Sequence, residues 1–181
     1  MSVIEISHIT KDYGKGRGVF DVSFNVKQGE VLGFLGPNGA GKTTTIRQLM
    51  GFIKPDSGKL SIRGMDCFKE ADQIQKSLGY LPGEIAFIDS MNGMEFIKFV
   101  AKMKKMKDLG RAQELMQMFE LNASGKLKKM SKGMKQKIGI VCAFMDSGSE
   151  ILILDEPTSG LDPLMQNRFV ELVLSEKKKG K

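Results

Sequence analysis

The chain has 181 residues, 28 basic and 21 acidic side chains with a formal net charge of +7, and two cysteines. This length supports one substantial hydrophobic core, so we expect a single domain with an inserted lobe. Cys67 and Cys142 are far apart and have no cysteine neighbours, which argues against a zinc site or a disulfide framework and favours a reducing compartment. Because no apolar stretch of ~20 residues and no signal-peptide core occurs, we expect a cytoplasmic chain that does not itself span a membrane.

Much of the basic excess lies in residues 102–107, 126–137 and 177–181. Solvated helix faces and helix C-termini explain these lysines about as well as a nucleic acid or an acidic membrane surface does. The charge alone therefore does not identify a partner.

The first third of the chain has strand patterns. Residues 3–9 and 19–26 alternate between apolar and polar side chains, which predicts two strands of a half-buried antiparallel sheet. Residues 31–35 are a continuous apolar run, which predicts a strand of a parallel sheet that is buried on both faces. A helix-compatible stretch follows at 44–50.

Between this apolar run and the helix, residues 36–43 satisfy the pattern G-x-x-x-x-G-K-[ST]. Its glycines let backbone N–H groups point into one concavity, to which the helix adds unpaired amides and the positive end of its dipole. Lys42 can reach the β- and γ-phosphates, and the Thr43 hydroxyl can ligate Mg²⁺. The alternative, a glycine-rich turn without a ligand, does not require a Lys-Thr pair in phase. The residues expected to contact a nucleotide here are Gly36, Pro37, Asn38, Gly39, Ala40, Gly41, Lys42, Thr43 and Thr44.

The strand signal is absent from about residue 83 to residue 129. Residues 59–63 and 76–81 are predicted strands, whereas 94–103 and 111–121 have helical spacing. Residues 83–133 are therefore predicted to form an inserted helical lobe. Methionines are frequent there, which suits a surface that accepts another protein's helix, although gap-filling core methionines are commoner.

A second candidate site follows a buried strand. Residues 151–154 are bulky and apolar, and Asp155 and Glu156 come directly after them, where the carboxyl edge of a sheet binds ligands. Asp155 would hold Mg²⁺ directly or through water, and Glu156 would orient or deprotonate the attacking water. Such an ending alone is more often ordinary than catalytic. Together with residues 36–43 it predicts a nucleoside triphosphatase, because metal-assisted phosphoryl transfer needs a carboxylate in addition to a lysine.

Two further segments, residues 131–133 and 159–162, complete a family pattern. Ser131 suits a helix N-cap whose turn has bare amides for an anion, with an ordinary cap as the alternative. The order of phosphate loop, Ser131-Lys132-Gly133, strand with Asp155-Glu156-Pro157, and Ser159-Gly160-Leu161-Asp162 resembles the nucleotide-binding domain of an ATP-binding cassette (ABC) transporter. The resemblance runs from about Val3 to the C-terminus.

The resemblance implies an α/β fold with a P-loop NTPase core. This core has a mixed sheet, with a parallel nucleotide-binding part and N-terminal antiparallel strands, and is formed by residues 1–82 and 134–181. An inserted helical subdomain at 83–133 ends in the signature motif and presents a groove to integral membrane permease subunits.

The resemblance also implies site roles. Ser131 and Gly133 contact the ATP held by a second cassette, in a head-to-tail homodimer or heterodimer, and Asp162 helps to pair the cassettes. Tyr13 stacks on adenine, for which the alternative is a tyrosine that packs on a loop. ATP and Mg²⁺ are the implied cofactors, with Lys42 and Glu156 as the catalytic residues.

Two departures from the family pattern matter. Lys132 and Met134 stand where the usual signature has Gly and Gln, a variant that resembles bacterial exporter cassettes of the drug and antibiotic-resistance type. The family's Q-loop glutamine has no clear match near Gly83-Glu84, so either Glu84 supplies an oxygen ligand to the metal or the role is lost.

We therefore expect the ATP-binding and ATP-hydrolysing subunit of an ABC exporter, peripheral on the inner face of the cell membrane. A non-transport cassette that acts on DNA or ribosomes is the alternative, with only the basic charge in its favour, so we expect no nucleic-acid partner. A nucleotide-binding regulator is a third reading, and Glu156 beside Asp155 argues against it.

The last predicted helix begins with Asp162 as its N-cap and Pro163 at its first position. In the family the next element is a strand that leads to a histidine at the γ-phosphate, and His8 is in the wrong place to substitute. The resemblance therefore predicts a C-terminally truncated cassette that turns ATP over slowly and dimerises weakly.

Overall fold

The computed structural model describes residues 2–181. These residues form two compact units. The first contains the chain up to Lys76 together with Lys177–Lys181, and the second contains Ser77–Glu176.

The first unit contains an antiparallel sheet of four strands in the order β2-β1-β3-β4. Its elements are β1 (Ser2–Asp12), β2 (Gly18–Lys27), α1 (Lys42–Leu49), β3 (Ser57–Ile62), β4 (Met65–Asp66) and α2 (Ala71–Lys76). Ile4, Ile6 and Ile9 of β1 are buried together with Leu60 and Ile62 of β3. The alternation predicted for 3–9 and 19–26 is thus confirmed as antiparallel pairing, which ends in the hairpin that carries Tyr13.

Between Ile6 and Lys11 of β1, a bulge in each strand shifts the β1–β2 register and then restores it. His8 in β1 and Asp21 in β2 both have φ of 51°, and His8 Nδ1 lies 2.7 Å from Asp21 Oδ1. On the other side of β1, Gly58 has φ of +87°, and a Cβ there would lie 2.4 Å from the carbonyl oxygen of His8. His8 therefore belongs to a structural feature of the sheet, and Gly58 is the residue that fits beside it.

The predicted strand at 31–35 is wrong. These residues have no regular secondary structure, and Val31 and Leu35 are 52% and 90% exposed. A continuous apolar run becomes a buried parallel strand only where neighbouring strands pair with its backbone. In the described residues this run has no ladder partner, and its packing includes Phe34, whose ring centroid lies 5.3 Å from that of Phe24.

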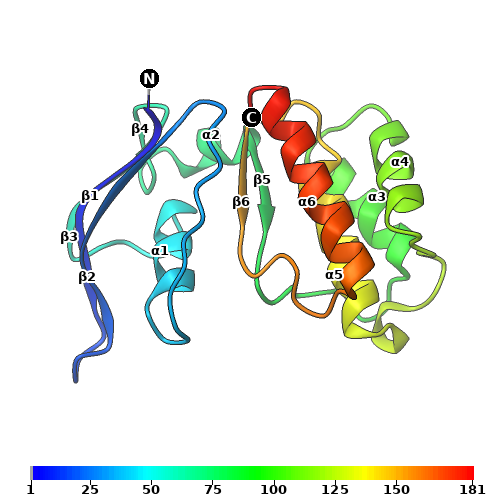
Figure 1. Ribbon diagram of the computed structural model, residues 1–181, viewed down its shortest axis with the longest axis horizontal. Coiled ribbons are helices and arrows are strands. Elements are labelled where there is room, and N and C mark those ends of the chain that lie inside the picture. Colours follow the sequence, from blue (N-terminus) through cyan, green and yellow to red (C-terminus); the bar gives the residue numbers. More distant parts are fainter. Residues whose placement is uncertain (1) are drawn as a thin grey trace. The chain divides into compact units, whose positions relative to one another are not determined.

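The second unit combines a parallel strand pair with helices. Its elements are β5 (Leu78–Leu81), α3 (Gly93–Met103), α4 (Gly110–Met118), a 3₁₀ turn (Leu127–Lys129), α5 (Lys132–Phe144), β6 (Ile151–Leu154) and α6 (Pro163–Lys178). β5 and β6 pair in parallel, so both predicted kinds of strand pairing are present, each in its own sheet. Helix α5 is central, because it contacts β5, α3 and α4 (Figure 1). Its buried residues, such as Ile138 and Phe144, belong to one core with Leu81, Ile97 and Leu115.

The helix starts follow the predicted signals. The Ser131 hydroxyl accepts a hydrogen bond from the Met134 N–H at 3.2 Å, which confirms Ser131 as the N-cap of α5. Asp162 Oδ1 accepts from the Met165 N–H at 3.0 Å, and α6 begins at Pro163.

Two ion pairs join α6 to the region of α4. Arg111 Nη2 lies 3.0 Å from Glu176 Oε1, whose side chain is only 3% exposed. Arg168 Nη2 lies 2.7 Å from Glu120 Oε1, just beyond the end of α4. The last helix and part of the predicted lobe are therefore held together by charge as well as by apolar packing.

Among residues 2–181, none of the helices has both the length and the apolar character that a membrane crossing needs.

Candidate functional site

The phosphate-binding motif forms an exposed loop that leads into α1. Gly39 and Gly41 have φ of 85° and 87°, values that favour glycine, and the Ala40 N–H donates to the Pro37 carbonyl at 3.2 Å. A Cβ on Gly41 would lie 2.5 Å from a methyl carbon of Val19 in β2. Glycine at this position therefore supplies both the left-handed backbone and the close approach of the loop to the sheet.

The start of α1 suits an anion. Gly41 is its N-cap and offers no side-chain cap, and the first turn contains no acidic residue. Backbone amides and the positive end of the helix dipole meet there. The Lys42 ammonium donates to the carbonyls of Gly36 and Pro37 at 2.7 and 2.9 Å, which holds its positive charge at the loop itself. The residues present therefore fit the phosphate groups of a nucleotide.

Tyr13 lies in the hairpin between β1 and β2, in the same unit as the loop. Its backbone N–H donates to the Arg17 carbonyl at 2.8 Å, and its side chain is 50% exposed. A half-exposed ring on a hydrogen-bonded turn is available for stacking.

The carboxylates lie in the second unit, directly after β6. Asp155 is buried, at 4% exposure, and its N–H donates to the Leu81 carbonyl at 2.9 Å, so it extends the pairing of β6 with β5. Glu156 is exposed and has φ of 46°, which is uncommon for a residue with a side chain. Asp155 is therefore held by the sheet, whereas Glu156 is at the turn that leaves it.

A buried glutamine holds that turn. Gln136 of α5 is 5% exposed, and its Nε2 donates to the carbonyls of Glu156 at 3.3 Å and Pro157 at 2.9 Å. The Ser159 N–H closes the turn by donating to the Glu156 carbonyl at 3.1 Å. Sequence reasoning missed Gln136, although a polar residue among the apolar positions of α5 was the available signal.

Residues 131–133, the predicted signature motif, lie close to Gly160, which follows the two carboxylates in the sequence. A Cβ on Gly133 would lie 2.7 Å from the Gly160 carbonyl oxygen, and the Lys132 side chain lies along Gly160, where a Cβ would lie 3.0 Å from Lys132 Cγ. The structure thus brings Ser131, Gly133, Glu156 and Gly160 into one region through α5. Only glycine at 133 permits this approach without a shift of the backbone.

Glu84 is exposed and follows Gly83, whose Cβ position would lie 3.2 Å from Asp155 Oδ2. Within residues 2–181, no group of three Asp, Glu, His or Cys side chains could hold a metal ion. An all-protein cage is thus not formed around Glu84 and Asp155. A Mg²⁺ ion held mainly by nucleotide phosphates needs only one or two protein oxygens, so the lack of such a cage does not exclude one.

Burial raises the pKa of Cys67 and of Cys142 to about 12, so both remain thiols at neutral pH.

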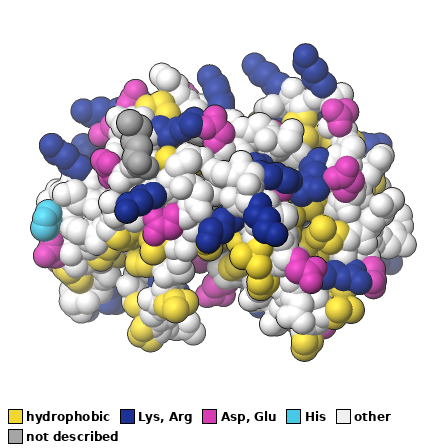
Figure 2. Space-filling view, turned by 45° about the horizontal axis from the view of Figure 1, so that its top comes forward, with side chains coloured by type: hydrophobic (Ala, Val, Ile, Leu, Met, Phe, Trp, Pro, Cys, Tyr) yellow, Lys and Arg dark blue, Asp and Glu magenta, His cyan; other side chains and the backbone are white. Residues whose placement is uncertain are grey.

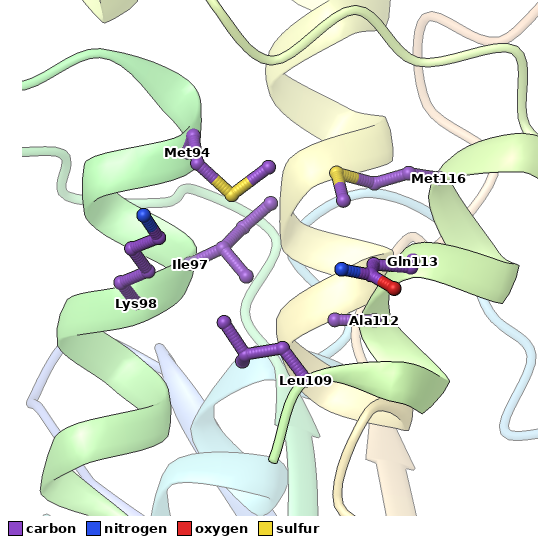
Figure 3. Close-up of a pocket in the computed structure, with 7 residues that line it drawn as sticks. All are labelled: Met94, Ile97, Lys98, Leu109, Ala112, Gln113 and Met116. Atoms are coloured by element: carbon purple, nitrogen blue, oxygen red, sulfur yellow. The ribbon is translucent and has the colours of Figure 1, made fainter.

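A pocket of about 170 Å³ lies between α3 and α4 of the second unit. Met94 of α3 and Met116 of α4 point toward one another there, with Ile97 and Leu109 beside them (Figure 3). Met94 and Met116 pack partly buried against the core, whereas Met103 is 70% exposed. Methionine thus serves both as gap filler and as exposed apolar surface in this lobe.

Comparison with known proteins identifies the family. A family model described as "ABC transporter" matches residues 19–159. The chain belongs to the ABC transporter family. The loop at 36–43, the Asp155-Glu156 pair and the α5 N-terminus thus lie in a cassette of this family.

Two curated relatives from Bacillus species show the extent of the similarity. The chain is 40% identical over 165 residues to the bacitracin transport ATP-binding protein BcrA of Bacillus licheniformis, an alignment that covers 90% of this chain and 54% of BcrA. It is 38% identical to the linearmycin resistance ATP-binding protein LnrL of Bacillus subtilis, over 94% of this chain and 56% of LnrL. The chain therefore spans about half the length of these relatives.

Solved structures share the fold. A structure described as the ATP binding subunit of an ABC transporter has a TM-score of 0.86 and 31% identity, and the match covers 99% of this chain and 76% of that one. The dimeric bacterial ABC transporter cassette MJ0796 also has a TM-score of 0.86, with 24% identity over 98% of this chain and 84% of that one. The predicted α/β cassette fold is confirmed.

Proposed function

We propose that this chain binds and hydrolyses ATP as the nucleotide-binding subunit of an ABC exporter, or as part of it. The observation that carries the proposal is the uncapped start of α1, where the Lys42 ammonium and the glycine-rich loop form an anion site. Family membership and relatives named for antibiotic transport or resistance support the exporter assignment.

In this proposal each motif residue has a separate task. Lys42 and the amides of residues 36–44 bind the phosphates, and Tyr13 stacks on the base. Thr43 in the first unit and Asp155 in the second are each a candidate ligand of Mg²⁺, which would supply positive charge against the negative charge that develops during transfer. Glu84 stays a further candidate ligand, with less support because among residues 2–181 it belongs to no group of three side chains that could hold a metal ion.

Glu156 would accept the proton of the attacking water or orient it. Glu156 directly follows a buried strand, and Gln136 donates a hydrogen bond to its carbonyl, which supports a defined location for this base.

Turnover by residues 1–181 alone is expected to be slow. Comparison of steady-state ATPase rates with a chain extended by a few dozen residues tests this, and equal rates would contradict it.

The partners proposed are a second cassette and integral membrane permease subunits. Ser131 and Gly133 would contact the ATP of the second cassette through the start of α5, and Asp162 would help to pair the two. We retain residues 83–133 as the lobe that faces the permease and residues 1–82 with 134–181 as the ATPase core. The α3–α4 pocket and exposed Met103 support an apolar docking surface on this lobe. The protein would then lie on the inner face of the cell membrane.

The comparisons favour the transporter role over the alternative, a cassette that acts on DNA or ribosomes. Its support is the net charge of +7, but the face in Figure 2 shows Lys and Arg side chains interspersed with acidic ones rather than gathered in one stripe. Purification of the protein with its natural partners separates the candidates, because an integral membrane protein is expected and nucleic acid is not.

Lys42→Ala tests the nucleotide site. Loss of a charged hydrogen-bond donor to the phosphates is expected to weaken MgATP binding by about tenfold to a hundredfold. Isothermal titration calorimetry of the full chain measures this, with Lys59→Ala, an exposed lysine of β3, as the matched control. Unchanged affinity in Lys42→Ala would contradict the assignment of the phosphate loop.

A further inference from the structure

The ammonium group of Lys11 lies over the aromatic ring of Tyr13. Lys11, two residues earlier at the end of β1, places its Nζ 5.9 Å from the ring centroid of Tyr13. This is within the range where the positive charge is attracted to the negative face of an aromatic ring. One face of the ring is therefore occupied by the protein itself, while the side chain as a whole stays half exposed.

Lys11 is itself held by a residue from a distant part of the sequence. Its Nζ lies 2.6 Å from Asp56 Oδ1, and the Lys11 side chain is only 22% exposed. Because Asp56 precedes β3, the pair joins the end of β1 to the segment that enters the neighbouring strand. The Lys11 ammonium is thus held over the ring by its ion pair with Asp56, in which Tyr13 takes no part.

Asp56 has no freedom to leave this position without breaking other bonds. Its second oxygen, Oδ2, accepts from the Asp12 N–H at 2.8 Å, and its own N–H donates to the Thr10 carbonyl at 2.8 Å. The hydrogen bond from Lys11, followed by the one from the Asp12 N–H, holds the pKa of Asp56 below its ordinary value. The carboxylate is therefore charged at neutral pH and accepts hydrogen bonds from Lys11 and Asp12, while the backbone N–H of Asp56 is bonded to Thr10.

We propose that Asp56 and Lys11 are positioning residues that hold the Tyr13 ring as the platform for the nucleobase. The inference rests on the proposed function, because it takes Tyr13 as the residue that stacks on the base. The base stacks on the face opposite Lys11, so cation, ring and base form three successive layers. Neither Asp56 nor Lys11 touches the nucleotide; each acts through the orientation and the electron distribution of the ring.

The test compares two ligands that differ in the base. MgATP and magnesium tripolyphosphate both occupy the phosphate loop, but only ATP reaches Tyr13. The ratio of their dissociation constants, measured by calorimetry on the full chain, therefore isolates the contribution of the platform. Changes of net charge act on both ligands and largely cancel in this ratio.

Asp56→Asn and Lys11→Met are both expected to weaken MgATP by about two- to fivefold relative to tripolyphosphate, the range of an exposed cation–π contact. Lys11→Arg should retain the parent ratio, because a guanidinium keeps both the ion pair and the contact with the ring. Asp66→Asn is the matched control, since Asp66 also accepts backbone hydrogen bonds, from Phe68 and Lys69, within the same unit.

The Tyr13→Ala background separates positioning from a general effect on folding. There, Asp56→Asn should leave the ratio unchanged, because the platform is gone. An equal loss for both ligands in Asp56→Asn, or a ratio that still changes in Tyr13→Ala, overturns the proposal. If Tyr13→Ala alone leaves the ratio unchanged, the platform of the proposed function fails as well. If Tyr13→Ala lowers the preference for ATP but Asp56→Asn and Lys11→Met do not, only the positioning role fails.

Discussion

The two units hold their motif residues in different ways. In the first unit, the phosphate loop and Tyr13 are exposed, and glycine conformations and short-range hydrogen bonds shape them. In the second unit, Asp155 is buried and the Glu156 turn is held by Gln136, a buried side chain 20 residues away. The first unit thus exposes a cation and an aromatic ring, whereas the second unit fixes the segment after β6 through buried contacts.

This difference predicts different consequences of mutation. Substitutions in the loop and hairpin should change ligand affinity with little effect on stability. Substitutions in α5 and the Glu156 turn should change stability or turnover with little effect on the affinity of the single chain for MgATP. The variants below test this division from the largest expected effect to the smallest.

Glu156→Gln should lower the rate of ATP hydrolysis by about 10²- to 10⁴-fold, because the amide keeps the shape of the side chain and loses the base. MgATP affinity should stay that of the parent, and a dimer-forming version should accumulate with ATP bound. Phosphate release and calorimetry measure the two quantities. Glu171→Gln, an exposed change on α6, is the control, and hydrolysis at the parent rate in Glu156→Gln would exclude Glu156 as the base.

Gln136→Leu should destabilise the chain by about 1–3 kcal/mol, because the carbonyls of Glu156 and Pro157 lose their buried donor. Turnover should fall with it, while MgATP affinity is retained. Urea unfolding followed by circular dichroism gives the stability, with Gln117→Leu on the exposed face of α4 for comparison. A stable variant with parent turnover would show that Gln136 does not position the turn.

Ser131→Ala should cost about 0.5–2 kcal/mol of stability, since α5 loses its side-chain cap. Ser131→Asp should restore most of this loss, because the carboxylate also accepts from the first turn. Thermal unfolding of the three proteins measures the difference. Weaker MgATP binding by the single chain in Ser131→Ala would contradict the division between the units.

Tyr13→Ala should weaken ATP and GTP binding by similar factors, about two- to tenfold, because stacking does not read the edge of the base. Tyr13→Phe should bind both nucleotides like the parent. Because Tyr13 is half exposed, neither change should shift the unfolding transition of the protein. A large loss in Tyr13→Phe would indicate a hydrogen bond from the hydroxyl instead of a stacked ring.

Local signals were sufficient for much of the fold and the site. The N-caps at Ser131 and Asp162 are formed by hydrogen bonds to backbone N–H groups three residues further on, so the local sequence patterns predicted them. The antiparallel pair β1–β2 was also predictable, because its alternation matches one buried face and a hairpin joins the strands.

Contacts between distant residues were decided only by the tertiary structure. The run at 31–35 has the composition of a buried strand, yet a strand also needs partner backbones, and the described chain pairs none with it. Lys11 and Asp56 are 45 residues apart, and Gln136 reaches the carbonyls of Glu156 and Pro157 from another element. A lysine, an aspartate or a glutamine fits many environments, so its partner depends on which distant segment packs beside it. The sequence around each of these residues does not specify that segment.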